Sequence, residues 1–463
     1  MDNVTHCLHK SMMEINHNIR ALREARGLSQ AKFAELLGVR QALLSAIELG
    51  KQSPTPQLIE NAKTLLSSVS DAEIASLKRK RTRHAGTINR GVVSERLEYL
   101  PPQPVREIPK YPTAISLFSG CGGMCLGFEN AGFCVLGNIE IDPELRAVYE
   151  LNFPHVPPLG TDVTQITDEE VSGWKNSFPK VDVVFGGPPC QGFSLVGKRN
   201  VNDSRNMLFT HMARIISILR PRYVVMENVR LLISMKAPDG SFIHSHITKA
   251  FKAIGYRMEF AELNAMDYGV PQFRERVFFI GVRDDLPKLT PIFPPATHGK
   301  PKAEPDLFNG QLHPYLTFRD ATHDLPSLEP GQVSPSDPLH FAVAHPPHVV
   351  EWLRHTPEGC SAHENSDPAH RPLSGYNTTY KRLRWDEPSS TIQTTFGMIS
   401  ASRTVHPSDH RSLTIREAMR CQTFPDYFRV SGKIGTIRTA IGNAVPPRFA
   451  EAIARHISSN GRF

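Results

Sequence analysis

The sequence lacks the long apolar runs of a membrane protein and the cysteine framework of a small secreted domain. No stretch approaches the roughly 18 apolar residues that span a bilayer, and the N-terminal stretch MDNVTHCLHKSMMEIN has no apolar core of the kind found in secretion signals. The seven cysteines are odd in number and show no disulfide spacing. Such thiols are typical of a reducing compartment, so we expect a cytoplasmic protein.

The composition is that of a folded protein with more than one domain. A length of 463 residues suggests two or three domains, and 40% hydrophobic and 21% charged residues are ordinary for a globular chain. The net charge of +7 is compatible with a polyanionic partner, although many basic proteins never bind nucleic acid. Charge alone therefore does not decide the function.

The N-terminal part, residues 1–70, predicts a small all-helical unit. Ser29 fits a helix N-cap, Gly38 fits a turn, and residues 39–49 fit a second helix with apolar side chains on one face. The stretch LSQAKFAELLGVRQALLSAIELGKQSP resembles the DNA-binding domains of phage-repressor and Xre-type regulators. A helical unit for protein contact or dimerisation is the alternative. The resemblance implies DNA contacts from Gln30, Arg40, Gln41 and Ser45.

Residues 71–112 predict a linker. A dense basic run, KRKRTRH, occupies residues 78–84, and five prolines between residues 101 and 112 oppose regular structure. The basic run fits either a segment that follows a phosphate backbone or a solvated linker face, and the sequence leaves both open.

The pattern becomes α/β from Ala114. A strand over residues 114–118 is followed by a glycine-rich turn and a helix, which is the first unit of a Rossmann-like fold. Glu140 follows the next strand, residues 135–139, and Asp162 follows a third element. Two acids in these places, behind a glycine turn, indicate a site for a nucleoside cofactor.

The stretch VDVVFGGPPCQGFS, residues 181–194, presents a cysteine on a stiff turn. Its apolar, β-branched start predicts a buried strand that the glycines and prolines end abruptly. Cys190 would then lie past the carboxyl end of a parallel strand, where ligands bind in such sheets. A small apolar residue in a tight loop is the alternative, but a nucleophile explains the arrangement better.

Six motifs in order resemble the DNA (cytosine-5) methyltransferase family of restriction-modification systems. Besides the PPCQ stretch and the glycine turn, the sequence has Glu227-Asn228-Val229 after a buried strand, and QFRER at residues 272–276 before another. The last motifs are LTIRE at residues 413–417 and IGNAVPP at residues 441–447. The resemblance implies an enzyme with a catalytic domain at residues 113–282 and a C-terminal catalytic part at residues 411–463.

The resemblance also implies the chemistry and its residues. Cys190 would add to C6 of a flipped-out cytosine, Glu227 would protonate near N3, and Arg276 and Arg274 would favour the thiolate. Gln191 and Ser194 would contact DNA around the vacated position. The implied S-adenosylmethionine contacts are Phe118, Gly120, Gly122, Gly123, Glu140 for the ribose, Ile141, Asp162 for the adenine, Pro189 and Asn443.

Residues 283–410 differ in composition from the rest of the chain. They hold 18 of the 38 prolines and 11 of the 20 histidines, which predicts irregular structure with short strands rather than helices. In the family this interval is the target-recognition domain. The histidines and Cys360 fit no paired-cysteine metal module, so we expect no metal. The histidines weighed for zinc are His345, His348, His355 and His363.

Three other functions are alternatives to this one. The chain would be a transcription regulator if the large domain served mainly as a DNA-binding scaffold. An RNA cytosine methyltransferase would have a different cysteine arrangement, and an exocyclic-amine methyltransferase would use an Asp/Asn-Pro-Pro-aromatic motif without the cysteine. We expect double-stranded DNA as the partner, and a separate operator for the N-terminal unit, which would regulate its own operon.

Overall fold

The computed structural model describes two compact units, Met1–Arg90 and Gly91–Phe463. No helix among the described residues has the length and apolar character needed to cross a bilayer. The described residues are 33–34, 36–39, 41–48, 55, 58, 61, 111–178, 180–189, 208–237, 239–300, 312–461 and 463.

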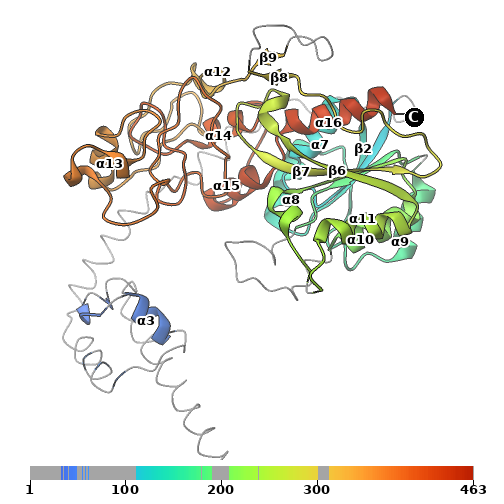
Figure 1. The fold of residues 1–463 in the computed structure, drawn as a ribbon, viewed down its shortest axis with the longest axis horizontal. Helices are drawn as coiled ribbons and strands as arrows, with labels where there is room; N and C mark the ends of the chain where they lie inside the picture. The colour runs from blue at the N-terminus through green and yellow to red at the C-terminus, as the bar shows by residue number, and fades with distance from the viewer. Residues whose placement is uncertain are drawn as a thin grey trace, which may run out of the picture. The chain divides into compact units, whose positions relative to one another are not determined.

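The N-terminal unit contains helix α3, Gln41–Glu48 (Figure 1). Leu44 and Ile47 of this helix are buried with Phe33 and Leu58 in a small apolar core. The helix begins two residues later than the predicted residue 39. Gln41 is exposed, and Ser45, predicted on the exposed face, is half-buried. Gln30 and Arg40 lie outside the described residues, as does nearly all of the predicted linker.

The second unit is built on a seven-stranded sheet of order β3-β2-β1-β4-β5-β7-β6 (Figure 1). Strands β1 to β5 are parallel, and β7 runs antiparallel to both of its neighbours. The strands are β1 Thr113–Leu117, β2 Cys134–Ile139, β3 Pro158–Gly160, β4 Val183–Gly186, β5 Tyr223–Val229, β6 Tyr256–Asn264 and β7 Glu275–Arg283.

Strand order reverses between β1 and β4, which are direct neighbours. Connections from these two strands leave in opposite directions along the sheet, so a crevice forms between their carboxyl ends. The predicted strands are close to the observed ones, with one difference that matters. Glu227 does not follow β5, as predicted, but lies within it, because pairing with β7 continues to Val229 opposite Arg276.

Helices cover both faces of the sheet (Figure 1). Apolar residues of α7, α8 and α16 pack with one face, and those of α9, α10 and α11 pack with the other. The sequence supports these helices locally: Asp142 caps α8, and Thr167 with Glu170 forms a capping box for α9. The bounds are α7 Gly123–Asn130, α8 Pro143–Asn152, α9 Asp168–Ser177, α10 Leu208–Leu219, α11 Ile243–Ala253 and α16 Pro447–Asn460.

The predicted irregular character of residues 283–410 holds for most of the described part. Strands β8, His298–Gly299, and β9, His313–Pro314, have two residues each. The prediction missed two short helices, α12 Phe318–Thr322 and α13 Pro347–Arg354. Proline in the first turn of α13 is compatible with a helix because that backbone nitrogen needs no partner there. The region also contains the short 3₁₀ helices Ala362–Glu364 and Pro368–His370. Two further 3₁₀ helices, Arg230–Ser234 and Ala265–Tyr268, lie earlier in the chain.

In this region a buried arginine donates to main-chain carbonyl groups that are not paired within a helix or strand. The guanidinium of Arg382 donates to the main-chain carbonyls of Leu353, Thr356, His406 and Asp409 at 2.6–2.8 Å. Buried carbonyl groups need such donors when no strand or helix supplies them. The region therefore has a defined core in spite of its prolines.

The C-terminal residues return to the sheet through α14, Ile415–Cys421, α15, Ile434–Asn443, and α16. The turn before α14 is fixed by Arg411, whose guanidinium binds both carboxylate oxygens of the buried Glu417 at 2.9 Å. Helix α16 then packs against α7, more than 300 residues earlier in the chain. Residues before 283 and after 410 therefore share one core, which also includes Phe318, Phe341 and Ile392 from the interval between them.

Replacing Gly127 by alanine should destabilise the second unit. A Cβ at Gly127 would lie 2.5 Å from the carbonyl oxygen of Pro447 and 2.6 Å from the Cβ of Ala450, so α7 and α16 would have to separate. We expect a loss of about 1–3 kcal/mol in the free energy of unfolding, measured by urea denaturation. Gly173 in α9 is the control, since it has open space around it and alanine there should stabilise by roughly 0.5–1 kcal/mol. Equal effects of the two substitutions would contradict this packing.

Candidate active site

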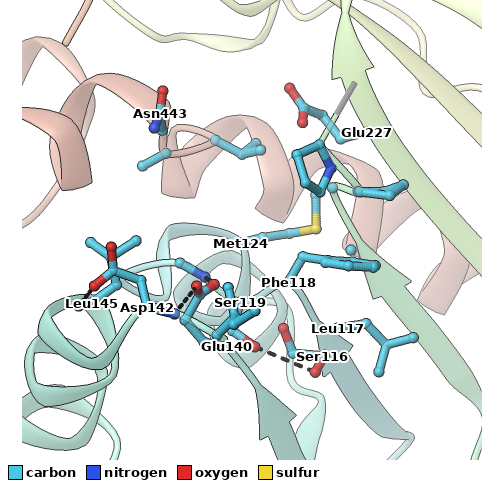
Figure 2. A pocket seen from close by; sticks show the side chains of 18 of the residues that line it. Ser116, Leu117, Phe118, Ser119, Met124, Glu140, Asp142, Leu145, Glu227 and Asn443 are labelled. Atoms are coloured by element: carbon cyan, nitrogen blue, oxygen red, sulfur yellow. Dashed lines mark hydrogen bonds between the residues drawn. The ribbon is translucent and has the colours of Figure 1, made fainter. Parts of the chain in front are cut away.

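A cavity of about 630 Å³ opens at the carboxyl ends of β1, β2, β4 and β5. It lies at the crevice that the strand order predicts. Figure 2 shows Glu227 on one side of the cavity, and Glu140 and Asp142 on the opposite side. The loops that follow the four strands supply most of the lining, and α15 contributes Thr439, Ala440 and Asn443.

The first loop combines unusual backbone conformations with close packing. Phe118 has a φ of 56°, and Gly120 and Gly122 have φ values of 56° and 96°. Phenylalanine rarely adopts this left-handed conformation, which the surrounding structure must impose. A Cβ at Gly123 would lie 2.5 Å from the carbonyl oxygen of Val445. The glycines therefore let the loop and the start of α7 pass close to the C-terminal part of the chain.

The second loop fixes the carboxylate of Glu140. Its two oxygens accept hydrogen bonds from the backbone nitrogens of Gly120, at 2.7 Å, and Asp142, at 2.9 Å. The side chain is buried and lines the cavity. Each oxygen keeps a second lone pair, so this carboxylate can still accept from two hydroxyl groups.

The third loop adds a carboxylate with one oxygen in use. Asp162 Oδ1 accepts from the nitrogen and the hydroxyl of Thr164, at 2.9 and 2.8 Å. Both Asp162 and Ile141 line the cavity, and 64% of the Ile141 side chain is exposed. An exposed isoleucine beside an acceptor oxygen provides an apolar surface and a hydrogen-bonding group, which suits a flat, amine-bearing ring.

The loop after β4 is held by the strand beside it. Asn228 Nδ2 donates to the carbonyl oxygen of Pro188 at 2.8 Å. A Cβ at Gly187 would lie 3.0 Å from Glu227 Oε2, so glycine lets the loop pass this carboxyl group closely. Pro188 and Pro189 both line the cavity. Cys190, Gln191 and Ser194 lie outside the described residues.

Glu227 and Arg276 form a buried ion pair at the cavity. Glu227 lies opposite Phe278 and Arg276 opposite Val229, so the two side chains are diagonal neighbours on one face of β5 and β7. Arg276 Nε lies 3.0 Å from Glu227 Oε1. Burial raises the pKa of Glu227 above the ordinary value for glutamic acid, against the opposing effects of Arg276 and Arg274. This carboxyl group thus holds its proton to higher pH than an exposed one.

Arg274, predicted to act beside Arg276, points elsewhere. Its guanidinium is fully buried and donates to the carbonyl oxygens of Ile392, at 3.1 Å, and of Gly442 and Ala444, both at 2.9 Å. The alternation of side chains cannot distinguish the two arginines, because residues two apart lie on the same face of an extended chain and only tertiary packing decides what each one meets. Arg274 fastens that returning chain, whereas Arg276 lines the cavity.

The described cysteines include no good nucleophile at the cavity. Cys121, Cys125 and Cys421 are buried, and burial raises the pKa of each thiol to about 12. Such thiols are almost fully protonated near neutral pH and correspondingly unreactive. Cys134 begins β2 at the strand end away from the cavity. Cys360 lies in the irregular region.

Sequence reasoning missed that Asn228 holds the loop after β4 by donating to the carbonyl oxygen of Pro188, since the motif gave Asn228 no function. The only signal was an amide next to Glu227, and that does not reveal a contact to Pro188. Met124, near the middle of the cavity in Figure 2, was also missed, because a methionine at a helix start usually belongs to the core.

The histidines weighed for zinc do not gather with Cys360. Among the described residues, one group of three potential metal ligands lies within 4.8 Å: Glu351, His355 and His370. His355 Nε2 lies 3.1 Å from Glu351 Oε1, and the rings of His355 and His370 stack at 3.7 Å. A surface hydrogen bond and a ring contact account for this cluster without an ion.

A second, more open cavity of about 1040 Å³ adjoins the first. The two share Val229, Leu231, Arg276 and Asn443. Residues 391–395 form another part of its wall. We call this second cavity the groove.

The family of C-5 cytosine-specific DNA methylases matches residues 113–459, and the helix-turn-helix family matches residues 19–61. The Type II methyltransferase M1.HphI of Haemophilus parahaemolyticus is 36% identical over 348 residues, which cover 74% of this chain and 86% of that protein. M.DdeI, a Type II methyltransferase of Desulfomicrobium norvegicum, is 33% identical over 384 residues, covering 74% of this chain and 88% of that protein.

Solved structures agree with the fold. The crystal structure described as a prophage-encoded DNA modification methyltransferase from E. coli has a TM-score of 0.57 and 26% identity, and covers 75% of this chain and 99% of that one. DNMT2 of Spodoptera frugiperda, at 17% identity and a TM-score of 0.50, covers 75% of this chain and 99% of that one, and shows the fold alone. The chain therefore belongs to the C-5 cytosine-specific DNA methylase family and is a DNA (cytosine-5-)-methyltransferase with a helix-turn-helix unit ahead of its catalytic part.

Proposed function

We propose that this enzyme transfers a methyl group from S-adenosylmethionine to C5 of a cytosine flipped out of duplex DNA, through a covalent bond to Cys190. The main support is the buried Glu227–Arg276 pair, 3.0 Å apart, at a cavity whose lining includes the two prolines directly before Cys190. Addition to a pyrimidine ring needs an acid, a cation and a nucleophile, and Cys190 follows the two prolines directly.

The cavity suits S-adenosylmethionine. Glu140, held by two backbone nitrogens, can accept from both ribose hydroxyls, and the free Oδ2 of Asp162 can accept from the adenine amine beside Ile141. When bound, this cofactor supplies a methyl group on a positively charged sulfur. The remaining proposed contacts are Phe118, Gly120, Gly122, Gly123, Pro189 and Asn443, all of which line the cavity or border it.

Cys190 makes the ring reactive. C5 of cytosine is a poor nucleophile, but addition of a thiolate to C6 places electron density on C5. After C5 has gained the methyl group, loss of its proton and expulsion of the thiolate restore the aromatic ring. A thiol of ordinary pKa is only roughly 3% ionised at pH 7, which costs about 2 kcal/mol. The positive charge of Arg276 favours the thiolate and reduces this cost.

Glu227 balances the charge that the addition creates. In its protonated form it donates to N3 of the cytosine, where negative charge builds up, and its other oxygen accepts from the exocyclic amine. Arg276 holds the carboxyl group in place at 3.0 Å. The raised pKa of Glu227 keeps the proton available to higher pH than on an exposed glutamic acid.

The target base must leave the duplex, because its C5 and C6 are otherwise inaccessible to the cavity. Unstacking costs a few kcal/mol, which contacts to the DNA must offset. Gln191 and Ser194, next to Cys190 in the sequence, would contact the DNA where the base was.

The N-terminal unit would bind a separate operator and regulate the enzyme's own operon. Its exposed Gln41 begins α3, the position from which a recognition helix contacts base edges, and Gln30, Arg40 and Ser45 would complete the contacts. The alternative, a regulator whose large domain is only a scaffold, is disfavoured by the buried acid of the cavity, which simple DNA binding does not require.

Replacing Cys190 by serine should abolish methylation. A hydroxyl is a far weaker nucleophile toward C6 than a thiolate. Bisulfite sequencing of a plasmid from cells that produce the wild-type enzyme should show modified cytosines in one short motif, and the variant should show none. Methylation by the serine variant at the wild-type rate would contradict the covalent route. Cys360→Ser, away from the cavity, serves as the matched control.

Replacing Glu227 by glutamine should slow methyl transfer by about 10²–10⁴-fold, because glutamine cannot give a proton to N3. The pH profile carries further information. Since burial raises the pKa of Glu227, wild-type kcat should fall as the pH rises through that pKa, and the fall should begin at a higher pH than for an exposed carboxyl group. The glutamine variant should lose this alkaline fall, whereas Glu259→Gln, on the exposed face of β6, should retain it. An unchanged alkaline fall in the Glu227 variant would exclude Glu227 as its cause.

Removing residues 1–85 should leave methylation intact and abolish binding to the promoter of the enzyme's own operon. Gel-shift titration with promoter DNA, alongside methylation of a plasmid, separates the two activities. Gln41→Ala in the full chain should reproduce the loss of promoter binding. Loss of methylation on truncation would contradict the assignment of promoter binding and methylation to separate parts of the chain.

A further inference from the structure

We propose that Arg438 binds a backbone phosphate of the DNA substrate at the edge of the groove. The inference rests on the proposed function, since it assigns a DNA contact to the same site. It concerns a residue of α15 that belongs to none of the sequence motifs and lines neither cavity.

The first observation is the position of Arg438. Helix α15 supplies Thr439 and Asn443 to the first cavity, and its Gly442 packs so closely on residues 393–394 that a Cβ would lie 2.5 Å from the carbonyl carbon of Gln393. Arg438 lies one helical turn before Gly442, against the next part of that segment. Its guanidinium is 5.7 Å from the ring centre of Phe396. Phe396 follows directly in the sequence after residues 391–395, which line the groove.

The second observation is an unbalanced charge. Arg438 is half-buried, and its Nε is buried without a hydrogen-bond partner among the described residues. No described carboxylate forms an ion pair with it. Burial lowers the pKa of Arg438, and no nearby acid opposes this effect. The neighbouring His345 adds no negative charge, and burial, together with Arg438 and Arg411, lowers its pKa to about 4.

The arginines that line the groove differ from Arg438 in this respect. Arg230 pairs with Glu262 at 2.8 Å and Glu275 at 2.9 Å. Arg276 pairs with Glu227, and Arg274 donates to three main-chain carbonyls. Each of these guanidinium groups already has hydrogen-bond or ion-pair partners within the protein. Arg438 is poised for an anion that the described residues do not supply.

A phosphate oxygen could supply the negative charge and the hydrogen-bond acceptor that the described residues do not offer to Arg438. Removing a guanidinium from water costs free energy unless an anion or acceptor replaces the water. The planar fork of arginine matches phosphate geometry, and the ring of Phe396 restricts where the fork can lie. A phosphate contact is independent of base identity, so this residue would position the duplex beside the first cavity without reading its sequence.

The test compares Arg438→Gln, Arg438→Lys and Arg455→Gln in the full chain. Arg455 lies on α16, where it pairs with Glu451 at 2.7 Å, so its variant loses one positive charge away from the groove. The quantities measured are the affinity for a duplex that carries the target motif in unmethylated form, and KM and kcat for methylation of that duplex. Each is measured at salt concentrations of about 50–200 mM.

Loss of a phosphate contact predicts a specific pattern. Arg438→Gln should weaken binding about tenfold at the lowest salt and raise KM with little change in kcat. The slope of log affinity against log salt should become less steep by about 0.9. Lysine should keep most of the slope and part of the affinity, and Arg455→Gln should change neither. The thermal unfolding midpoint of Arg438→Gln should change little, because the variant loses the contact with the Phe396 ring but no hydrogen bond or ion pair to a described residue.

Three results would overturn the proposal. An unchanged salt slope would exclude a phosphate contact, and an equal change in Arg455→Gln would reduce the effect to net charge. A relaxed preference at one base pair of the methylated motif would assign Arg438 to base reading instead. If the wild-type enzyme produces no 5-methylcytosine, the proposed chemistry fails, whereas the salt dependence of duplex binding still decides the role of Arg438.

Discussion

The contact between Glu227 and Arg276 is the interaction on which the rest of the cavity depends. In the proposed chemistry Glu227 serves as an acid, which requires burial to favour its protonated form and a partner to hold it in place. Arg276 provides the partner at 3.0 Å, from the neighbouring antiparallel strand. The effects oppose each other, since a close cation favours loss of the proton while burial favours its retention. Burial has the larger effect, so the pKa of Glu227 lies above its ordinary value.

A chain that leaves the sheet and returns completes the wall of this cavity. After β7 the chain runs through the irregular region and comes back as α14, α15 and α16. Arg274 fastens the return by donating to the carbonyls of Ile392, Gly442 and Ala444, so adjacent motif arginines divide two tasks between them. Gly123 and Gly127 remove the Cβ atoms that would hold α7 away from the returning helices. The enzyme therefore closes its active site with residues more than 300 positions apart.

The sequence was sufficient for the fold class, and its proposed cofactor contacts, apart from Gly122, line the cavity together with Glu227 and Arg276. Short β-branched runs predict buried strands, and the strand order of an α/β fold predicts where Glu140, Asp162 and Glu227 meet. It was insufficient wherever tertiary contacts choose between similar residues. Nothing local distinguishes Arg274 from Arg276, and nothing marks Asn228 as the partner of Pro188. The helices α12 and α13 were missed because prolines and histidines dominate their surroundings, while the buried Val349 and Leu353 decide the outcome for α13.

The central claim is that Cys190 forms a covalent bond to the target base, and one measurement tests it most directly. A duplex with 5-fluorocytosine at the methylated position allows addition and methyl transfer but blocks release, because the fluorine cannot leave as the proton does. Mass spectrometry of the wild-type enzyme incubated with this duplex and S-adenosylmethionine should show one adduct, on the peptide that contains Cys190. An adduct on another cysteine, or none in an enzyme that still methylates ordinary DNA, would contradict the account.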